Sequence, residues 1–535
     1  MNDTYTVAGH FPTFRRLFGW LLSWRTIRRC LFLLACLVTM IAFFYAEENW
    51  RGARAWNKSR RELEARGAQL DYRAFIPKPV PDEQNFAATP LVKSWFVKEN
   101  LNRSQLDWDD YGRVLGRIHD PKNKQWGRQS FMDLVAWKMA FASLQSGATN
   151  LHEVFLTTNR TDSETRAQAA PAILAGMKSS ETILGELRTA SQRPYSCYPV
   201  QYDLENPWGI MIPHLARVKG VIHRLQLHAC AELATGQSAS AVEDVKLMLY
   251  LADSVKREPI LISYLVRLDC FQIAVQPVWE GLADHRWSDS QLQELQRRLR
   301  QFNFLSDMMR PLEGERAAGI LTADLLYRQK YRVSELFDLD RPDPTGGDFL
   351  NLVGRVAPHG WYYQEVVNYC RLYESQLDGT FDAAAKRVLP KQVESRAHEL
   401  EGEISGGRLG KGLNAVLHHQ VIAAMLLPAL GKISLRAATA QTLADQAALA
   451  CALERFRLAN GQFPENLDAL VPRFLDKIPG DVISGEPLKY RRANDRRFVL
   501  YSVGWNEKDD GGTPGKNFFD EKEGDWVWRY PEKQD

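Results

Sequence analysis

A long run of hydrophobic residues near the start of the chain is the clearest pattern in the sequence. Residues 30–46 read CLFLLACLVTMIAFFYA and contain no charged side chain. As a helix this run would span about 25 Å, which is the short end of what the hydrocarbon core of a bilayer requires. We therefore expect a single transmembrane helix at 30–46, in contact with membrane lipid.

An apolar run of this kind has three alternatives to an uncleaved anchor. A cleaved signal peptide needs small residues before the cut, whereas Phe44 places a bulky side chain three positions back. A lipoprotein signal would use Cys36, but the apolar stretch before it is only a few residues long and continues well past it. A buried core helix is the third alternative, and the shortness of the run favours it.

The charges on either side of the run indicate its orientation. Arginines precede it and glutamates follow it: Arg15, Arg16, Arg25, Arg28, Arg29, then Glu47 and Glu48. Because positive flanks stay in the cytoplasm, we expect the N-terminus in the cytoplasm and the bulk of the chain in the periplasm, beyond the inner membrane. Residues 1–29 are predicted to form a cytoplasmic amphipathic segment along the membrane surface.

Residues 47–84 are predicted to form a charged stalk followed by a linker. Charged side chains dominate residues 50–70, which is typical of a solvated helix. Pro77, Pro79 and Pro81 then predict an extended linker, because proline lacks a backbone donor and restricts the residue before it.

Residues 85–431 show mainly helical periodicity and are predicted to form a helical body. Capping boxes are expected at Ser240 with Glu243 and at Ser288 with Gln291, where each pair satisfies free amide groups at a helix start. Paired helices with short turns predict a stack of α-hairpins, and an irregular helical domain is the alternative.

The remaining residues, 432–535, combine a helix with strands. A helix rich in Ala and Leu ends at Asn460-Gly461, since glycine can adopt the left-handed conformation that stops a helix. Alternating strands follow at 488–490 and 498–502. The predicted fold class is therefore mainly α, with a transmembrane helix, a hairpin-stack-like body and a small C-terminal α+β domain.

Composition excludes some classes of function. The formal net charge of +3 is too small for a nucleic-acid surface, so no nucleic-acid partner is expected. The seven cysteines form no C-x-x-C pair, and we interpret them as buried free thiols rather than zinc ligands.

The body offers no recognisable catalytic motif. Residues 405–412 are similar to a phosphate-binding loop, but Ser405 replaces its first glycine and Gly412 its metal-binding hydroxyl. The adjacent His418 and His419 would point about 100° apart on a helix and could not easily share a metal. No catalytic residue is therefore assigned, and His223 and His228 are interpreted as core or partner-bound side chains.

The last hundred residues contain an ordered series of short motifs. After Asn460-Gly461 come Pro464, Asp481, Gly485-x-Pro487, Tyr490, Phe498, Tyr501-Ser502-x-Gly504, Asp509-Asp510-Gly511-Gly512 and Asp525-Trp526. This order resembles the globular domain of the major pseudopilins of type II secretion, and the resemblance implies a pseudopilin-like domain. The chain departs from that family at its N-terminus, where the anchor lacks the pseudopilin leader and lies far from the module. The remainder resembles uncharacterised membrane-anchored proteins of the Planctomycetes and Verrucomicrobia.

The resemblance to pseudopilins also implies calcium as a cofactor. Their corresponding acidic loop binds calcium, and Asp509 and Asp510 are the matching residues here. Asp525 and Asn506 are expected to complete the metal site, with Asp520 a less direct candidate. Calcium takes six to eight oxygen ligands, which a glycine-rich acidic turn can supply. The alternative is a solvated acidic turn without metal.

These observations favour a membrane-anchored extracytoplasmic structural or interaction protein of the bacterial cell envelope. Protein partners are expected, and the pseudopilin-like module suggests a link with secretion or pilus-like assemblies. The alternative is an envelope enzyme with a dispersed active site, for example near residues 359–363. Its mark would be a concave pocket where a histidine and a carboxylate converge with perturbed pKa values.

Overall fold

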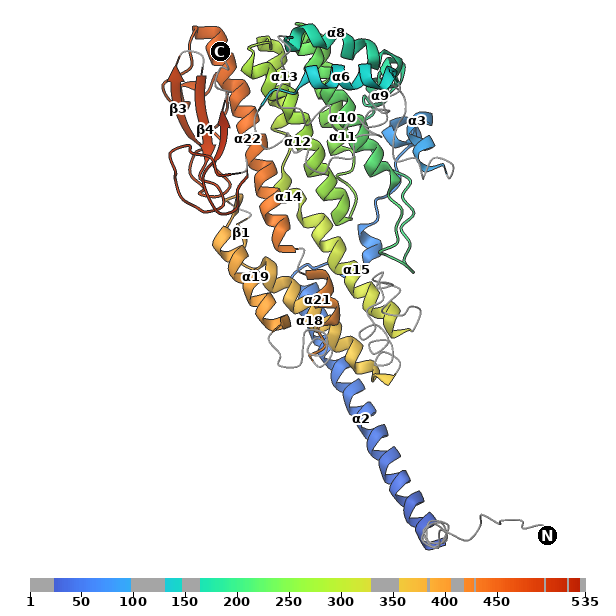
Figure 1. The fold of residues 1–535 in the computed structure, drawn as a ribbon. Helices are drawn as coiled ribbons and strands as arrows, with labels where there is room; N and C mark the ends of the chain where they lie inside the picture. The colour runs from blue at the N-terminus through green and yellow to red at the C-terminus, as the bar shows by residue number, and fades with distance from the viewer. Residues whose placement is uncertain are drawn as a thin grey trace, which may run out of the picture.

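The computed structural model describes residues 24–97, 130–146, 164–328, 356–382, 385–405, 418–427, 430–494, 497–516 and 519–529. It is mostly helical, with 66% helix and 6% strand, which confirms the predicted mainly α fold class. Figure 1 shows one long helix projecting from a large helical body, and a small sheet on the far side of that body.

The projecting element is α2 (Trp24–Ala65), a single helix that contains both the apolar run and the charged segment after it. Ten large apolar side chains between residues 31 and 44 are 46–74% exposed. The helix is long and apolar enough to cross a membrane, as the sequence predicted. Its charged half is not a free stalk, however, because Glu48, Gly52 and Leu63 are buried against the body.

The segment after α2 lies on the surface of the body rather than forming a free linker. It consists of short helical turns: η2 (Tyr72–Phe75), η3 (Asp82–Gln84), η4 (Phe86–Ala88), α3 (Pro90–Lys93) and η5 (Ser94–Phe96). Asn85 fixes it by accepting a hydrogen bond from the Cys197 amide (2.8 Å) and donating one to the Cys197 carbonyl (2.9 Å).

The body is a set of packed helices. Its elements are α6 (Leu134–Gln145), α8 (Arg166–Met177), η7 (Lys178–Ser180), α9 (Glu181–Ala190), α10 (Pro213–Ala234), α11 (Ser238–Asp253), α12 (Leu261–Ala283), α13 (Asp289–Leu299), α14 (Phe304–Asp307) and α15 (Met309–Tyr327). Helices α10, α11 and α12 pack on one another in sequence order, and α6 with α8 covers α10. Short turns join α10 to α11 and α11 to α12, so consecutive helices pair as the periodicity indicated.

The two predicted capping boxes had different outcomes. The box at Ser288 and Gln291 is present at the start of α13, so that prediction is confirmed. The box at Ser240 and Glu243 is wrong, because α11 begins earlier, at Ser238, and has no side-chain cap. Glu243 instead forms an ion pair with Lys246 (2.7 Å) on the same helix.

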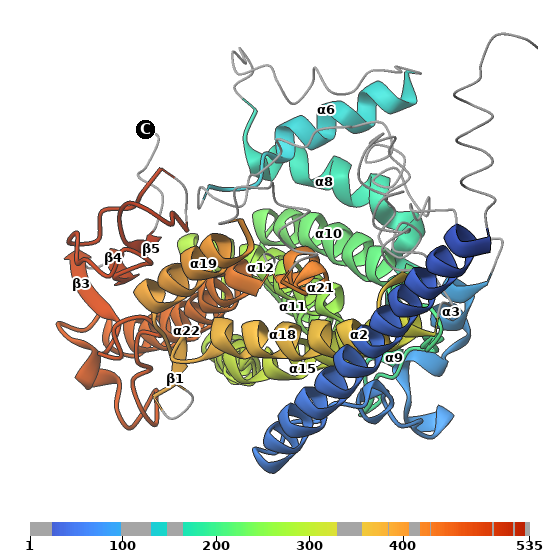
Figure 2. The same ribbon diagram turned by 90° about the horizontal axis from the view of Figure 1, so that it is seen from below.

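The second half of the chain crosses the base of the body and then returns along it. It comprises α18 (His359–Leu377), β1 (Phe381–Asp382), β2 (Arg387–Val388), α19 (Pro390–Ser405), α21 (Val421–Leu426) and α22 (Leu430–Asn460). Strands β1 and β2 pair antiparallel, and α18 lies across α2, as Figure 2 shows from below.

Helix α22 joins the body to the C-terminal unit through one continuous core. It packs on α13, α12 and α14 on one side and on β4 on the other. The stretch Val421–Asn460 is also apolar enough to cross a membrane, but half of its most apolar window is buried inside the protein. That burial is what a core helix shows, and the helix ends at Gly461 (φ +81°), as predicted.

The C-terminal unit contains an antiparallel sheet of β3 (Lys489–Asn494), β4 (Arg497–Ser502) and β5 (Trp526–Arg529), in that order. The strands expected at 488–490 and 498–502 are confirmed, whereas β5 was not predicted. Trp526 and Trp528 of β5 are almost fully buried, and Gln446 of α22 donates to the Trp526 carbonyl (2.7 Å).

Asp481 ties this sheet to the turn that precedes it. Its carboxylate accepts hydrogen bonds from the hydroxyl of Ser502 (2.8 Å) and from the amides of Val503 (3.1 Å) and Ile483 (3.0 Å). The side chain is 2% exposed, so these donors replace the water that a buried carboxylate loses.

Candidate functional site

The place where the apolar part of α2 meets the body is the first candidate site. Helices α2 and α18 cross there with Gly52 facing Gly360, and their backbones approach so closely that a methyl group on either glycine would overlap the other helix. Gly52 lies in the interior of α2, where glycine is unfavourable relative to alanine, and Gly360 lies in the first turn of α18. Close contact between the helices therefore explains why glycine, which has no side chain, occupies both positions.

Polar contacts surround the crossing. The carboxylate of Glu48 accepts hydrogen bonds from Trp361 Nε1 (3.1 Å), Gln364 Nε2 (3.1 Å) and Arg51 Nη1 (2.7 Å). Asn49 Oδ1 accepts from the amide of Gly360 (2.8 Å). This amide is in the first turn of α18, where no partner exists within the helix, so Asn49 acts as a cap supplied by another element.

The described contacts at this crossing hold two helices together, and the ring of His419 lies against Trp361 with ring centroids 5.1 Å apart. Glu48 is buried, yet it has three donors and lies beside the N-terminus of α18, where the helix dipole favours a negative charge. The segment 359–363, where the sequence placed a possible enzyme site, is thus the first turn of α18, and its Trp361 binds Glu48.

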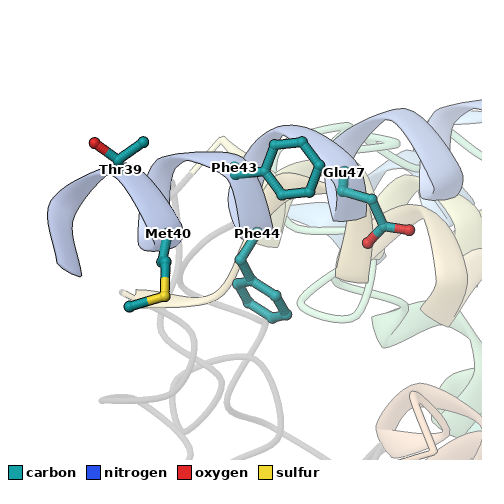
Figure 3. A pocket seen from close by; sticks show the side chains of 5 residues that line it. All are labelled: Thr39, Met40, Phe43, Phe44 and Glu47. Atoms are coloured by element: carbon teal, nitrogen blue, oxygen red, sulfur yellow. The ribbon is translucent and has the colours of Figure 1, made fainter. Parts of the chain in front are cut away.

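An open hollow lies beside the crossing, on the apolar half of α2. Its volume is about 410 Å³, and it is lined by Thr39, Met40, Phe43, Phe44 and Glu47. Figure 3 shows Met40 and Phe44 one turn apart on the same side of the helix. Met40, Phe43 and Phe44 make most of its lining apolar, and Thr39 and Glu47 are its polar members.

We expect Gly360→Ala to destabilise the junction by about 1–3 kcal/mol, because the added methyl group must displace the backbone of α2. The measurement is the thermal unfolding midpoint of the full chain in detergent. Gly402→Ala in α19 is the matched control: nothing lies within 4 Å of its added methyl group, so it should leave the midpoint unchanged or raise it. Equal midpoints for the Gly360 variant and the wild type would contradict the role of the crossing.

The second candidate is a buried ionic centre formed by α9, α10 and α11. His228 on α10 contacts Asp244 of α11 through Nδ1 (2.7 Å) and Glu181 of α9 through Nε2 (2.8 Å). Glu232, one turn after His228, lies 3.6 Å from Nδ1, and Arg188 of α9 forms an ion pair with Asp244 (2.5 Å). Asp244 is fully buried, and His228 and Glu232 nearly so.

The neighbouring charges set the protonation of this centre. Burial alone would lower the pKa of His228, but hydrogen bonds to Asp244 and Glu181 outweigh it and raise the pKa to about 10. Burial, with the charge of Asp244, raises the pKa of Glu232 to about 7. The hydrogen bond with His228 lowers the pKa of Glu181. At neutral pH, the imidazolium and the Arg188 guanidinium therefore balance the carboxylates.

His228, Glu232 and Asp244 are close enough together to hold a metal ion, so a metal site was considered. The contacts argue against it. Both ring nitrogens of His228 lie within hydrogen-bond distance of carboxylates, and these contacts raise its pKa and favour the protonated ring, whereas a metal requires an unprotonated nitrogen. Arg188 would also place a positive charge next to the ion. We interpret the cluster as an ionic connection between three helices.

We expect His228→Gln to lower the free energy of unfolding by about 3 kcal/mol near pH 6, because it leaves buried carboxylates without their cation. A raised histidine pKa stabilises the fold below the unfolded value of 6.5, and this stabilisation is lost as the pH rises toward about 10. The difference between variant and wild type, measured by denaturant unfolding, should therefore shrink between pH 7 and pH 10.

The exposed His398 provides the control for this experiment, since His398→Gln should leave unfolding unchanged over the same range. Stoichiometric zinc in the purified wild-type chain, lost in the His228 variant, would contradict the ionic interpretation and support a metal centre.

The acidic loop predicted to bind calcium lies at the edge of the C-terminal sheet. Asp525, directly before β5, accepts hydrogen bonds from the amides of Asp510 (3.2 Å) and Gly512 (2.7 Å). Asp509 accepts from the Gly511 amide (3.0 Å), and Asn506 donates to Asp510 (3.3 Å). The structure thus brings the predicted residues into one loop, with Asp525 buried beneath it.

In this arrangement backbone amides donate to both carboxylate oxygens of Asp525 and to Oδ1 of Asp509, which are oxygens that calcium would use. Burial raises the pKa of Asp525, and its amide donors act in the opposite direction. The Gly511 amide lowers the pKa of Asp509. Calcium binding therefore stays a prediction, and it would require Asp525 to exchange amide donors for the ion. Asp520 caps its own turn through the amides of Lys522 (2.9 Å) and Glu523 (3.1 Å).

If calcium binds here, millimolar calcium should raise the thermal unfolding midpoint of the wild-type chain, because an ion that binds only the folded state stabilises it. The double variant Asp509→Asn with Asp510→Asn should lose this rise, and magnesium should not reproduce it. Identical midpoints with calcium and with chelator would exclude the site and leave an amide-bonded acidic turn.

The other residues singled out in the sequence do not form a site in the described part of the chain. The carbonyls of His418 and His419 accept hydrogen bonds from Asn368 of α18. Burial lowers the pKa of His223 to about 4. The segment 406–412 lies outside the described residues. The described cysteines have no disulfide, and Cys230, Cys270, Cys370 and Cys451 are buried, as predicted. The prediction of buried thiols is wrong for Cys30, which is exposed, and for Cys36 and Cys197, which are only partly buried.

Sequence reasoning missed the junction and the ionic centre. Isolated glycines at 52 and 360, inside otherwise helical segments, were an available signal for a close helix crossing. No signal links Asp244 to His228, because their contact depends on how α10 and α11 pack. Comparison of the chain with protein-family models, with curated proteins and with solved structures finds no match.

Proposed function

We propose that this chain is a single-pass membrane protein of the bacterial cell envelope that holds a helical interaction body outside the cytoplasm. In this proposal, residues 30–46 cross the inner membrane, the N-terminus lies in the cytoplasm, and the body acts as a structural or interaction scaffold for protein partners. The C-terminal unit is proposed to be a pseudopilin-like domain that contacts secretion or pilus-like assemblies.

The observation that carries the proposal is the exposure of the apolar half of α2. Its ten large hydrophobic side chains between residues 31 and 44 are 46–74% exposed, and a contiguous exposed apolar surface of this kind is rare on soluble monomers. Nine Leu, Ile, Val and Phe side chains contribute about −4 kcal/mol to insertion. Arg25, Arg28 and Arg29 at one end and Glu47 and Glu48 at the other support the proposed orientation.

The shape of the molecule supports a scaffold role. Figure 1 shows the C-terminal sheet at the end of the body opposite the projecting half of α2, so the anchor and the sheet occupy two ends of one unit. Hydrogen bonds fix that sheet to the body, from Trp279 to the Arg529 carbonyl (3.0 Å) and from Trp505 to Glu394 (3.0 Å). A partner bound at the C-terminal unit would therefore be held at a fixed distance from the membrane.

The test is protease protection in spheroplasts that express the full chain with a C-terminal tag. We expect added protease to remove the tag while a cytoplasmic control protein stays intact, and the chain to remain in the membrane after alkaline extraction. Val38→Arg should move the chain toward the soluble fraction, since one central arginine costs about 3 kcal/mol of insertion. Leu458→Arg, at an exposed position of α22, is the matched control and should not.

A tag protected from protease in intact spheroplasts, or a wild-type chain recovered in the soluble fraction, would refute the proposed topology.

A further inference from the structure

The first turn of α18 lies at the level where the apolar run of α2 ends. The hydroxyl of Tyr45 donates to the carbonyl of Val356, and Asn49 and Glu48 accept from Gly360 and Trp361. The helix rises about 5 Å from residue 46 to residue 49, the last α2 residue that makes these contacts. Headgroups add about 5–8 Å to each side of a bilayer core. If residues 30–46 span the core, these contacts therefore fall within the headgroup layer.

The side chains at this level are those that favour a membrane interface. Tyr327, the last residue of α15, packs against three residues of the first turn of α18, with ring centroids 4.6 Å from His359, 6.0 Å from Tyr362 and 5.9 Å from Tyr363. Tyrosine and tryptophan concentrate at membrane–water interfaces because their rings are apolar and their polar atoms bind water or headgroups.

The exposure of these side chains and the charges near them also suit a membrane interface. Val356 is 58% exposed and His359 is also exposed, beside the half-buried Tyr362 and Tyr363. On α2, Trp50 is 62% exposed. Two glutamates and two arginines lie nearby: Arg51 contacts both Glu47 and Glu48, and Arg54 lies over the ring of Trp50 (5.3 Å). A surface of exposed apolar and aromatic groups with balanced charges suits a phospholipid headgroup layer and does not require anionic lipid.

We propose that this base of the body, formed by Tyr327, Val356, His359, Tyr362 and Tyr363, contacts the headgroup layer of the extracytoplasmic leaflet. The body would then lie against the membrane instead of standing away from it on a stalk. The Gly52–Gly360 crossing keeps it there, because α2 has no linker between its apolar run and the docked segment. This inference rests on the proposed membrane anchor.

The experiment is site-specific photo-crosslinking of the full chain in vesicles of phosphatidylcholine. Benzoylphenylalanine replaces one residue at a time: Phe43 on the apolar run, Val356 at the base, or Ile262 as the control. Ile262 matches Val356 in exposure (55% and 58%). Its distance from the base follows from its neighbour Leu261, whose amide donates a hydrogen bond to Glu315 of α15. Glu315 lies about 18 Å along α15 from Tyr327, which is part of the base. Ile262 is thus well outside the headgroup layer.

We expect lipid adducts, detected by mass spectrometry, at Phe43 and at Val356, with a yield at Val356 several-fold above that at Ile262. Replacing phosphatidylcholine by phosphatidylglycerol should not change the ratio. Adducts at Phe43 combined with equal, low yields at Val356 and Ile262 would overturn the seating of the body while leaving the anchor intact. Low yields at all three positions would overturn the proposed anchor itself.

A second variant tests the cause of the contact. Trp361→Phe removes the indole donor to Glu48 but keeps an aromatic ring in the first turn of α18. We expect it to lower the lipid yield at Val356 and to leave the yield at Phe43 unchanged. An unchanged yield at Val356 would show that the junction does not hold the base at the membrane.

Discussion

The close crossing of α2 and α18 is the contact on which the rest of this architecture depends. Gly52 and Gly360 allow the two backbones to touch, and Glu48 and Asn49 then bind the first turn of α18. One helix therefore belongs to two environments, with an exposed apolar half and a half docked on the protein. Because a continuous helix is stiff, the orientation of the body relative to the apolar half is fixed by this crossing.

The interior tolerates several charged groups because they come as matched sets. His228 and Arg188 offset the carboxylates between α9, α10 and α11. Arg267, which is 1% exposed, contacts Asp253 (2.6 Å) and Asp307 (2.8 Å) in the same way. Removing one member of such a set lowers the free energy of unfolding by more than the complete set adds to it, because a buried charge is left unpaired.

Helix α22 gives the body and the C-terminal sheet a common core. Its residues from 437 to 454 are almost all buried, many of them alanines that let neighbouring helices approach closely. The boundary expected near residue 432 therefore does not separate two independent cores. The same helix packs on α12 and α13 and on β4, so the position of the sheet depends on the integrity of the body.

The sequence by itself determined the elements whose signal is local. The apolar run at 30–46, the helical periodicity of the body, the cap at Ser288, the helix end at Gly461 and the strands near 490 and 500 depend on neighbouring residues, and all are present. The acidic residues 509, 510 and 525 lie close together, with Asp525 bonded to the Asp510 amide, and calcium binding there stays a prediction. Tertiary structure alone decided what these elements contact. The charged half of α2 reads as a solvated stalk because most of its residues are polar, and only the packing of α18 buries its Glu48 and Gly52. His228 and Asp244 are brought together by the packing of α10 on α11. That packing depends on the shapes of many side chains and produces no periodic pattern in the sequence.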